Sequence, residues 1–137
     1  MSSKTSESAN RPRILVMDDE EAIRDISQTM LEKFGFEARL AQNGEEAVAI
    51  YKDAMDEGKQ FNAVLLDLTV PGGMGGEEAA QKILAMDTRA RIIVSSGNSG
   101  DTMMTEYDKH GIMGALPKPY RIGELKKAVE SVLETPS

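Results

Sequence analysis

The sequence predicts an α/β domain whose core is an open parallel sheet of five strands with helices on both faces. Short apolar runs recur along the chain, as in Ile14–Met17 and Ala63–Leu66, and segments with helical spacing separate them. Runs of this length and composition are typical of strands that are buried on both faces of a parallel sheet. Regular alternation of strand and helix signals favours a single sheet with right-handed crossovers.

Composition and charge are those of one soluble globular domain. The chain has 137 residues, of which 40% are hydrophobic and 28% are charged. The 16 basic and 23 acidic residues give a net charge of −7, which argues against direct nucleic-acid binding. Cysteine is absent, which excludes disulfides and thiolate metal sites. No run approaches the ~20 apolar residues of a membrane span, and residues 1–10 are too polar for a signal peptide. We therefore expect a cytoplasmic protein without membrane insertion.

The chain divides into a short polar tail and one domain. Residues 1–11 are rich in serine and carry no apolar periodicity, so we expect a disordered tail or linker there. Strand and helix signals begin at residue 12 and continue to residue 134 without a repeat or a second boundary.

In the first half of the domain, each predicted element follows from its local pattern. A strand over 13–17 precedes a helix that should stop at Gly35. Residues 36–41 alternate apolar and polar side chains and read as a strand near the sheet edge. Asn43-Gly44 is interpreted as a turn, and the helix after it should close at Gly58. The apolar stripes are Ile23, Ile26, Met30 and Phe34 in the first helix and Ala47, Ile50, Tyr51 and Ala54 in the second.

The second half repeats this alternation. Residues 61–66 form the most apolar strand and should lie at the centre of the sheet. After a glycine-rich loop and a helix come a fourth strand over 91–94, a short helix over 101–109, and a fifth strand over 113–116. The apolar stripes of the flanking helices are Ala79, Ala80, Ile83 and Leu84, and Ile122, Leu125, Val129 and Val132.

Polar side chains follow four of the predicted strands. Asp18-Asp19, Asp67, Ser95 and Lys118 each come directly after an apolar run. Ligands of such sheets bind beyond the carboxyl ends of the strands, so these groups should meet at one edge. Three carboxylates, a hydroxyl and an ammonium indicate a metal-dependent site for a phosphoryl group, because Mg²⁺ prefers oxygen ligands. Taken singly, each acid is as well explained as a helix cap, and the serine as a turn residue.

Two of these residues have a more specific interpretation. Asp67 could accept a phosphoryl group as an acyl phosphate, since a carboxylate after so apolar a strand is costly unless it is paired or metal-bound. Lys118 is unusually placed for a surface charge, and its ammonium could neutralise phosphoryl oxygens or the acid cluster. Pro119 permits a cis peptide that would direct the lysine inward.

Together, the order and separation of Asp18-Asp19, Asp67, Ser95 and Lys118-Pro119 resemble the receiver domain of two-component response regulators. The resemblance spans about residues 12–134 and implies the flavodoxin-like strand order 2-1-3-4-5. It also implies that the domain catalyses only its own phosphorylation and dephosphorylation. We therefore do not expect an enzyme that turns over an external substrate.

The resemblance assigns a role to each site residue. Asp67 would be the phosphoacceptor. Asp19 would bind Mg²⁺ directly, Asp18 directly or through water, and the backbone carbonyl of Thr69 would complete the protein ligands together with Asp67.

Contacts to the phosphoryl group are assigned in the same way, to Ser95 and Lys118. Its donor would be a phosphohistidine on a histidine kinase or a histidine phosphotransfer protein, and a downstream effector is a further possible partner. Phosphoryl transfer depends on in-line positioning and charge neutralisation, which this set of groups can supply.

The sequence departs from the family pattern at two places. Ala115 stands where receivers often carry an aromatic residue that moves on phosphorylation, so output should travel by another route; Tyr107 and Tyr120 are candidate substitutes. The loop 71–76 is one residue longer than the common form, and it resembles receivers of hybrid sensor histidine kinases. Thr69 and Gly97 leave the site uncrowded, which predicts an acyl phosphate without a shield against hydrolysis.

Two other function classes remain open at this point. A small phosphatase of the haloacid-dehalogenase kind also uses an Asp, a Ser or Thr and a Lys, and Asp67-Leu68-Thr69 weakly resembles its nucleophile motif. However, Thr69 replaces the second acid of that motif. A receiver-like binding module that is never phosphorylated is the other alternative.

Overall fold

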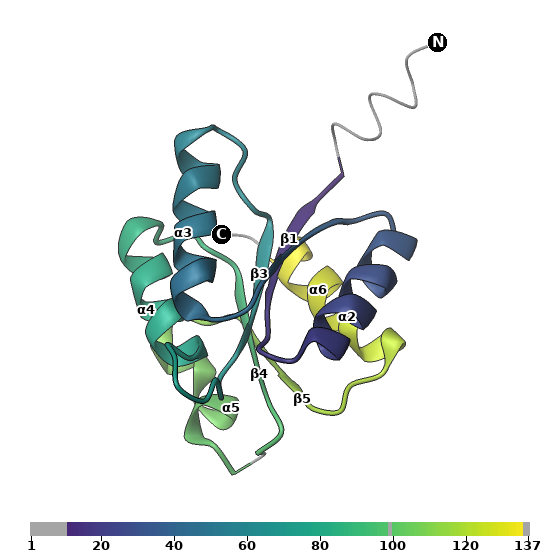
Figure 1. Ribbon diagram of the computed structural model, residues 1–137, viewed down its shortest axis with the longest axis vertical. Coiled ribbons are helices and arrows are strands. Elements are labelled where there is room, and N and C mark those ends of the chain that lie inside the picture. Colours follow the sequence, from purple (N-terminus) through teal and green to yellow (C-terminus); the bar gives the residue numbers. More distant parts are fainter. Residues whose placement is uncertain (1–10, 99, 136–137) are drawn as a thin grey trace.

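The computed structural model describes residues 11–98 and 100–135, and its centre is a sheet of five parallel strands (Figure 1). The strands are β1 (Arg13–Met17), β2 (Glu37–Ala41), β3 (Ala63–Asp67), β4 (Ile92–Ser96) and β5 (Gly114–Pro117). Their order is β2-β1-β3-β4-β5, which confirms the predicted topology. Of the predicted tail, residues 1–11, all but Arg11 lie outside the described residues.

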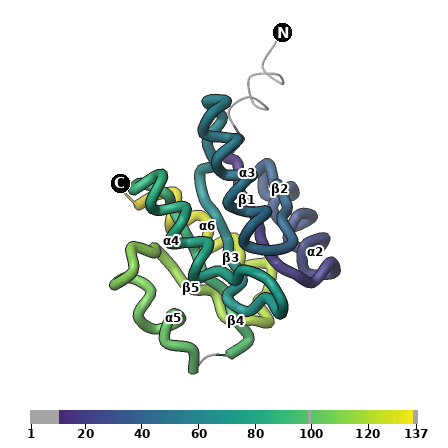
Figure 2. Tube along the Cα trace, turned by 60° about the vertical axis from the view of Figure 1, so that its left-hand side comes forward, coloured from purple at the N-terminus to yellow at the C-terminus, as the bar shows by residue number. Residues whose placement is uncertain are grey.

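Helices cover both faces of the sheet (Figure 1). One layer consists of α2 (Glu21–Lys33) and α6 (Ile122–Glu134). The other consists of α3 (Gly44–Asp56), α4 (Gly76–Met86) and the short α5 (Thr102–Thr105), which leads into a 3₁₀ turn, η1 (Tyr107–His110). Figure 2 shows α3 and α4 packed side by side, with α5 below them. Within the described part of the chain, no helix is long and apolar enough to cross a membrane.

The core consists of two apolar clusters, one on each face of the sheet. Leu15 and Leu66 pack toward α3 and α4, whereas the neighbouring Val16 and Leu65 pack toward α2 and α6. Successive residues of a strand point to opposite faces, and here both faces are covered. This is why the inner strands read as continuous apolar runs, and all five residues of β3 are buried.

Three strands extend further than their apolar runs predicted. We expected strands to end at residues 66, 94 and 116, but β3, β4 and β5 end at Asp67, Ser96 and Pro117. The ladder even continues past the ends, since the Leu68 N–H donates to the Ser95 carbonyl over 2.8 Å. Backbone hydrogen bonding between strands does not depend on side-chain polarity. A prediction from hydrophobicity alone therefore ended these strands one or two residues early.

One local prediction was wrong, and one needs a more specific description. The helix expected over 101–109 breaks at Glu106, where φ is −114°, and continues only as a 3₁₀ turn. The chain bends at Asn43 as expected, and Asn43 also caps α3 by accepting a 2.9 Å hydrogen bond from the Glu46 N–H. Asparagine serves both roles with the same side-chain oxygen, so the dipeptide alone could not distinguish them.

The face by which α2 packs also differs from the prediction. Ser27 and Leu31 are its buried residues. Ile26, predicted to lie in the apolar stripe, is 52% exposed, and Ile23 and Met30 are only half-buried. The stripe therefore lies at the edge of the core: Met30 and Phe34 pack against the cluster beneath α2 and α6, whereas Ile26 points to solvent beside the segment after β5.

Gly44, the first residue of α3, has no room for a side chain. A Cβ there would lie 2.6 Å from Met74 Cγ and 2.7 Å from the Met74 carbonyl oxygen, which accepts a 2.8 Å hydrogen bond from the Gly44 N–H. We expect Gly44→Ala to lower the free energy of unfolding by about 1–3 kcal/mol, because backbone must move. Urea denaturation measures this. Gly123→Ala, where nothing lies within 4 Å, is the matched control and should be neutral or slightly stabilising.

Candidate functional site

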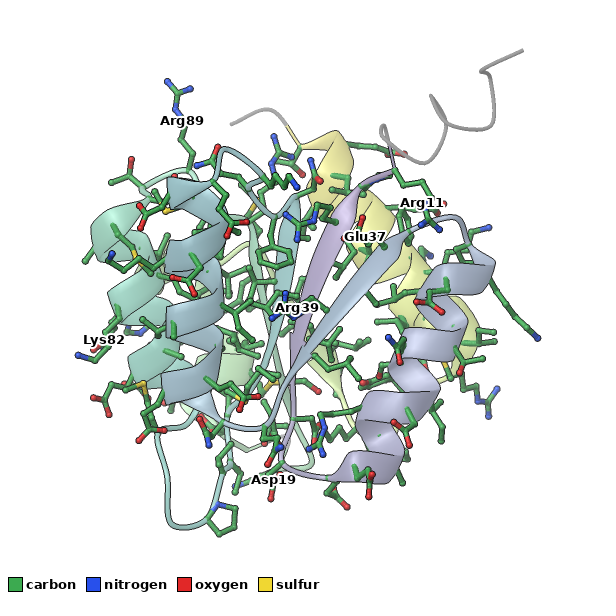
Figure 3. All side chains as sticks on the ribbon, turned by 45° about the horizontal axis from the view of Figure 1, so that its top comes forward. Arg11, Asp19, Glu37, Arg39, Lys82 and Arg89 are labelled. Atoms are coloured by element: carbon green, nitrogen blue, oxygen red, sulfur yellow. The ribbon has the colours of Figure 1, made fainter. Side chains whose placement is uncertain are left out.

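All the predicted site residues gather at the carboxyl ends of the strands. Figure 3 shows Asp19 at this end of the molecule and Arg11 and Arg89 at the opposite end. Asp67 is the last residue of β3, and Ser95 is paired with it in register on the neighbouring strand. Asp18 follows β1, and Lys118 follows β5. Parallel strands thus bring together residues that are far apart in the sequence.

Three carboxylates form the centre of the site. One oxygen from each of Asp18, Asp19 and Asp67 lies within 4.8 Å of the others. Asp18 and Asp67 are both 3% exposed, whereas Asp19 is open to solvent. Like charges this close repel one another, so the group favours a bound cation.

Lys118 supplies a cation to two of the three acids. Its Nζ lies 2.6 Å from Asp18 Oδ2 and 3.2 Å from Asp67 Oδ2, and the Lys118-Pro119 peptide is cis. Burial lowers the pKa of this ammonium, but the hydrogen bond to Asp18 and the charges of Asp67 and Asp18 outweigh burial. The pKa of Lys118 therefore lies above its ordinary value, and the side chain stays charged.

Asp67 is held in an unfavourable place for a carboxylate. Burial, and next the charge of Asp18, raise its pKa from 3.8 to about 6, although Lys118 and the Thr69 N–H act in the opposite direction. The Thr69 N–H donates to Asp67 Oδ1 over 3.2 Å. At neutral pH the acid is ionised but poorly solvated, which suits a group that reacts with an electrophile.

Asp18 has a partner for every polar group. Its N–H donates to the Ala41 carbonyl (3.1 Å), and its Oδ1 accepts from the Glu20 N–H (2.9 Å). Its Oδ2 meets Lys118, and its carbonyl accepts a 2.7 Å hydrogen bond from Arg24 Nη1. The sequence reasoning missed Arg24; a basic residue in the helix right after an acid pair was the available signal.

Ser95 is buried without a partner. Ser95 is only 2% exposed. Among the residues that the structure describes, its Oγ is the one buried side-chain polar atom that lacks a hydrogen bond. Such an atom is normally satisfied, so the hydroxyl of the residue paired with Asp67 is available to donate to a ligand oxygen.

An open hollow of about 430 Å³ lies over the acids and is lined by Asp19, Asp67, Thr69, Gly97 and Lys118, among others. A phosphoryl group with a metal ion and its waters fits in this volume. Oxygen donors with one exposed carboxylate suit Mg²⁺, which keeps several waters in its shell.

The glycine-rich loop after β3 packs on the strand that carries Asp67. A Cβ at Gly76 would lie 2.7 Å from the Asp67 carbonyl oxygen, and one at Gly75 would lie 2.6 Å from that of Leu68. The glycines therefore permit a close approach within the chain itself, and they fix the path of the loop beside the site.

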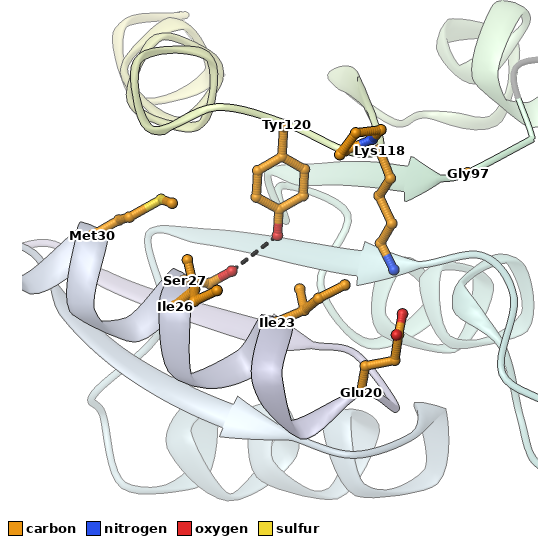
Figure 4. Close-up of a pocket in the computed structure, with 9 residues that line it drawn as sticks. Glu20, Ile23, Ile26, Ser27, Met30, Gly97, Lys118 and Tyr120 are labelled. Atoms are coloured by element: carbon orange, nitrogen blue, oxygen red, sulfur yellow. Dashed lines mark hydrogen bonds between the residues drawn. The ribbon is translucent and has the colours of Figure 1, made fainter.

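A second hollow, of about 440 Å³, adjoins the site between α2 and the segment after β5 (Figure 4). We call it the α2 groove. Its lining is mainly apolar, and Glu20 and Lys118 connect it to the site. The Tyr120 hydroxyl shares a 2.9 Å hydrogen bond with buried Ser27 at its base. The apolar lining side chains are Ile23, Ile26, Met30, Pro119 and Tyr120.

The two candidate substitutes for the missing aromatic residue lie on different faces of the sheet. Tyr107 and Ala115 pack against the cluster beneath α3 and α4, whereas Tyr120 packs against the cluster beneath α2 and α6. Of the two tyrosines, Tyr107 is therefore the one on the same face of the sheet as Ala115. Its role in output stays a prediction.

Comparisons with known proteins agree with this geometry. The family model described as "Response regulator receiver domain" matches residues 14–130. The chain is 32% identical over 121 residues to the chemotaxis protein CheY of Thermotoga maritima, covering 88% of this chain and 96% of that protein. It is also 30% identical over 115 residues to the autoinducer 1 sensor kinase/phosphatase LuxN of Vibrio campbellii. That match covers 84% of this chain but only 13% of LuxN.

Among solved structures, the CheX–CheY–BeF₃–Mg²⁺ complex from Borrelia burgdorferi contains a similar chain. The TM-score is 0.79 at 26% identity, with 90% of each chain covered. Fold, strand-end groups and family match thus lead to one assignment. The chain belongs to the response regulator receiver domain family, whose members are phosphoacceptors in two-component signalling.

Proposed function

We propose that Asp67 accepts the phosphoryl group from a phosphohistidine, with Mg²⁺ bound beside it, in a receiver domain that spans residues 12–134. The observation that carries this proposal is the buried carboxylate of Asp67, which contacts the ammonium of Lys118 and belongs to a residue paired in register with Ser95, whose hydroxyl has no partner. One acceptor and two groups that can bind phosphoryl oxygens therefore surround the same point.

The metal would be held by the carboxylates of Asp19 and Asp67 and the carbonyl of Thr69. Asp18 would act from behind them, since both of its carboxylate oxygens already have partners. Bound there, Mg²⁺ would neutralise charge on the phosphoryl oxygens. The side chains of Asp67, Lys118 and Ser95 would supply the acceptor and the other contacts to the phosphoryl group.

In the transfer step, a carboxylate oxygen of Asp67 forms a bond to phosphorus as the phosphorus–nitrogen bond to the donor histidine breaks. The electron pair of that bond stays with the imidazole, which leaves neutral once it is protonated. The Lys118 ammonium, 3.2 Å from Asp67, shifts to a phosphoryl oxygen, and the Ser95 hydroxyl donates to another. Positioning and charge neutralisation lower the barrier.

Small phosphodonors test this proposal directly. Incubation with acetyl phosphate or phosphoramidate and Mg²⁺ should add one phosphoryl group, about 80 Da in the intact mass. The gain should vanish with EDTA and in Asp67→Asn. No gain with either donor would leave a donor-specific receiver or a binding module that is never phosphorylated, and failure of a partner phosphohistidine protein to modify Asp67 would then decide for the binding module. The receiver family assignment removes the basis for the phosphatase alternative.

The partner that supplies the phosphoryl group should be a histidine kinase or phosphotransfer protein that presents an apolar helix surface to the α2 groove. Ile26 is 52% exposed and lines this groove, whose other end reaches Lys118. Apolar grooves of this kind accept amphipathic helices. A downstream effector and a place inside a longer sensor kinase remain predictions, as does a cytoplasmic location.

Ile26→Glu should lower the kcat/KM of transfer from a phosphohistidine protein at least tenfold relative to the rate with acetyl phosphate, because a charge would enter an apolar contact. Ile122→Glu is the matched control, since Ile122 is 45% exposed but lies outside the groove. Equal losses in both variants would rule out the groove as the docking site.

The phosphorylated form should decay measurably within a day. Thr69 and Gly97 are exposed at the rim of the hollow, and neither is large enough to keep water from the acyl phosphate. Loss of the added mass with time, after removal of the donor, gives the rate. A mass that does not change over a day would contradict this prediction.

A further inference from the structure

Arg24 makes a contact that the phosphoryl chemistry itself does not require. Its guanidinium Nη1 donates a 2.7 Å hydrogen bond to the backbone carbonyl of Asp18. That carbonyl belongs to the peptide that joins Asp18 to Asp19. The orientation of this peptide decides where the Asp19 side chain leaves the backbone.

The other side of Asp18 is fixed by different means. Its N–H bonds to the Ala41 carbonyl of β2 over 3.1 Å, so the preceding peptide is part of the sheet. Its side chain accepts from the Glu20 N–H over 2.9 Å, which shapes the turn after it. The peptide between the two acids is held by a side chain, and that side chain is Arg24.

We propose that Arg24 is a positioning residue for the metal site, which it serves by fixing the Asp18–Asp19 peptide so that the Asp19 carboxylate faces Asp67. The inference rests on the proposed function. A charged donor to a carbonyl oxygen makes a strong hydrogen bond, and Arg24 is itself half-buried on α2. With the peptide fixed, the three carboxylates stand within 4.8 Å before a cation arrives.

The alternative role for Arg24 predicts the opposite change in Mg²⁺ affinity when the residue is removed. If its guanidinium acted only as a positive charge near three carboxylates, removing it would strengthen the attraction for Mg²⁺. If it positions Asp19, removing it leaves a metal ligand free to move, and Mg²⁺ binding weakens. Supporting groups behind a metal ligand typically contribute 10–100-fold to affinity.

Isothermal titration with Mg²⁺ separates the two roles. We expect Arg24→Gln to raise the Kd about tenfold, and Arg24→Lys, which keeps the charge, to fall between Gln and the parent protein. Lys33→Gln is the matched control, because it removes the same charge from the exposed end of the same helix. A Kd that is unchanged or lower in Arg24→Gln would overturn the inference.

A second measurement does not depend on the metal. The ¹⁵N order parameter of the Asp19 amide, in the metal-free protein, should fall from about 0.85, typical of rigid backbone, toward about 0.6 in Arg24→Gln. An unchanged value would also overturn the inference. Absence of Mg²⁺ binding by the parent protein would instead refute the proposed function, and the order parameter would still test Arg24.

Discussion

Replacing Lys118 with methionine is expected to lower the rate of phosphorylation by acetyl phosphate about 10²–10³-fold. The ammonium lies 3.2 Å from Asp67 and is the charged donor closest to the point where phosphoryl oxygens would arrive. Charge that develops there would lose a preorganised partner in a poorly solvated site. Methionine is unbranched and keeps the apolar stem of the side chain up to the terminal nitrogen, so the loss should report the charge.

The rate of mass gain at fixed donor concentration measures this effect. Lys127→Met, an exposed position on α6, is the matched control and should match the parent protein. Mg²⁺ should bind Lys118→Met at least as tightly as the parent, since a cation beside the acids has been removed. A phosphorylation rate within threefold of the parent would exclude Lys118 from the chemistry.

Asp67→Asn should make the metal-free protein more stable at neutral pH while abolishing phosphorylation. The pKa of Asp67 is about 6 in the folded protein against an ordinary value of 3.8. Between these values the native protein keeps a proton that the unfolded chain has released, so the free energy of unfolding falls as the pH rises. Above pH 6 the full penalty for the buried carboxylate, roughly 3 kcal/mol, remains. The asparagine amide does not ionise, so the Asp67→Asn protein does not carry this penalty.

Urea denaturation at several pH values, in EDTA, measures the difference between the two proteins. The difference in the free energy of unfolding should be small near pH 4, grow through pH 5 and 6, and level off above pH 7. Asp25→Asn, whose side chain is exposed on α2, controls for the loss of one negative charge. A difference that does not depend on pH would show that burial of the Asp67 charge is not its cause.

Together, these two expectations describe a site whose geometry serves function rather than stability. Asp18 and Asp67 are buried close together and rely on Lys118 for a counter-charge. A bound cation or a phosphoryl group would therefore change the local balance of charge. Sites of this kind commonly lower stability in exchange for reactivity.

The sequence by itself determined the kinds of element, their succession, and the identity of the acids, the serine and the lysine at the strand ends. It could do so because burial on both faces leaves a continuous apolar run, and because parallel strands all end at the same edge. The strand order came from the family resemblance, since no local pattern encodes which strands are neighbours. The apolar pattern also did not predict the exact ends of β3 to β5, because backbone pairing continues through polar residues.

Only the tertiary structure decided how α2 faces the sheet and what it touches. The helix buries Ser27 and leaves Ile26 at the surface, which creates the α2 groove, and it sends Arg24 to the Asp18 carbonyl. Helical periodicity identifies an apolar stripe, but the direction of that stripe depends on how the crossover returns to the sheet. Contacts such as Ser27 with Tyr120, 93 positions apart, arise from that packing and leave no local trace in the sequence.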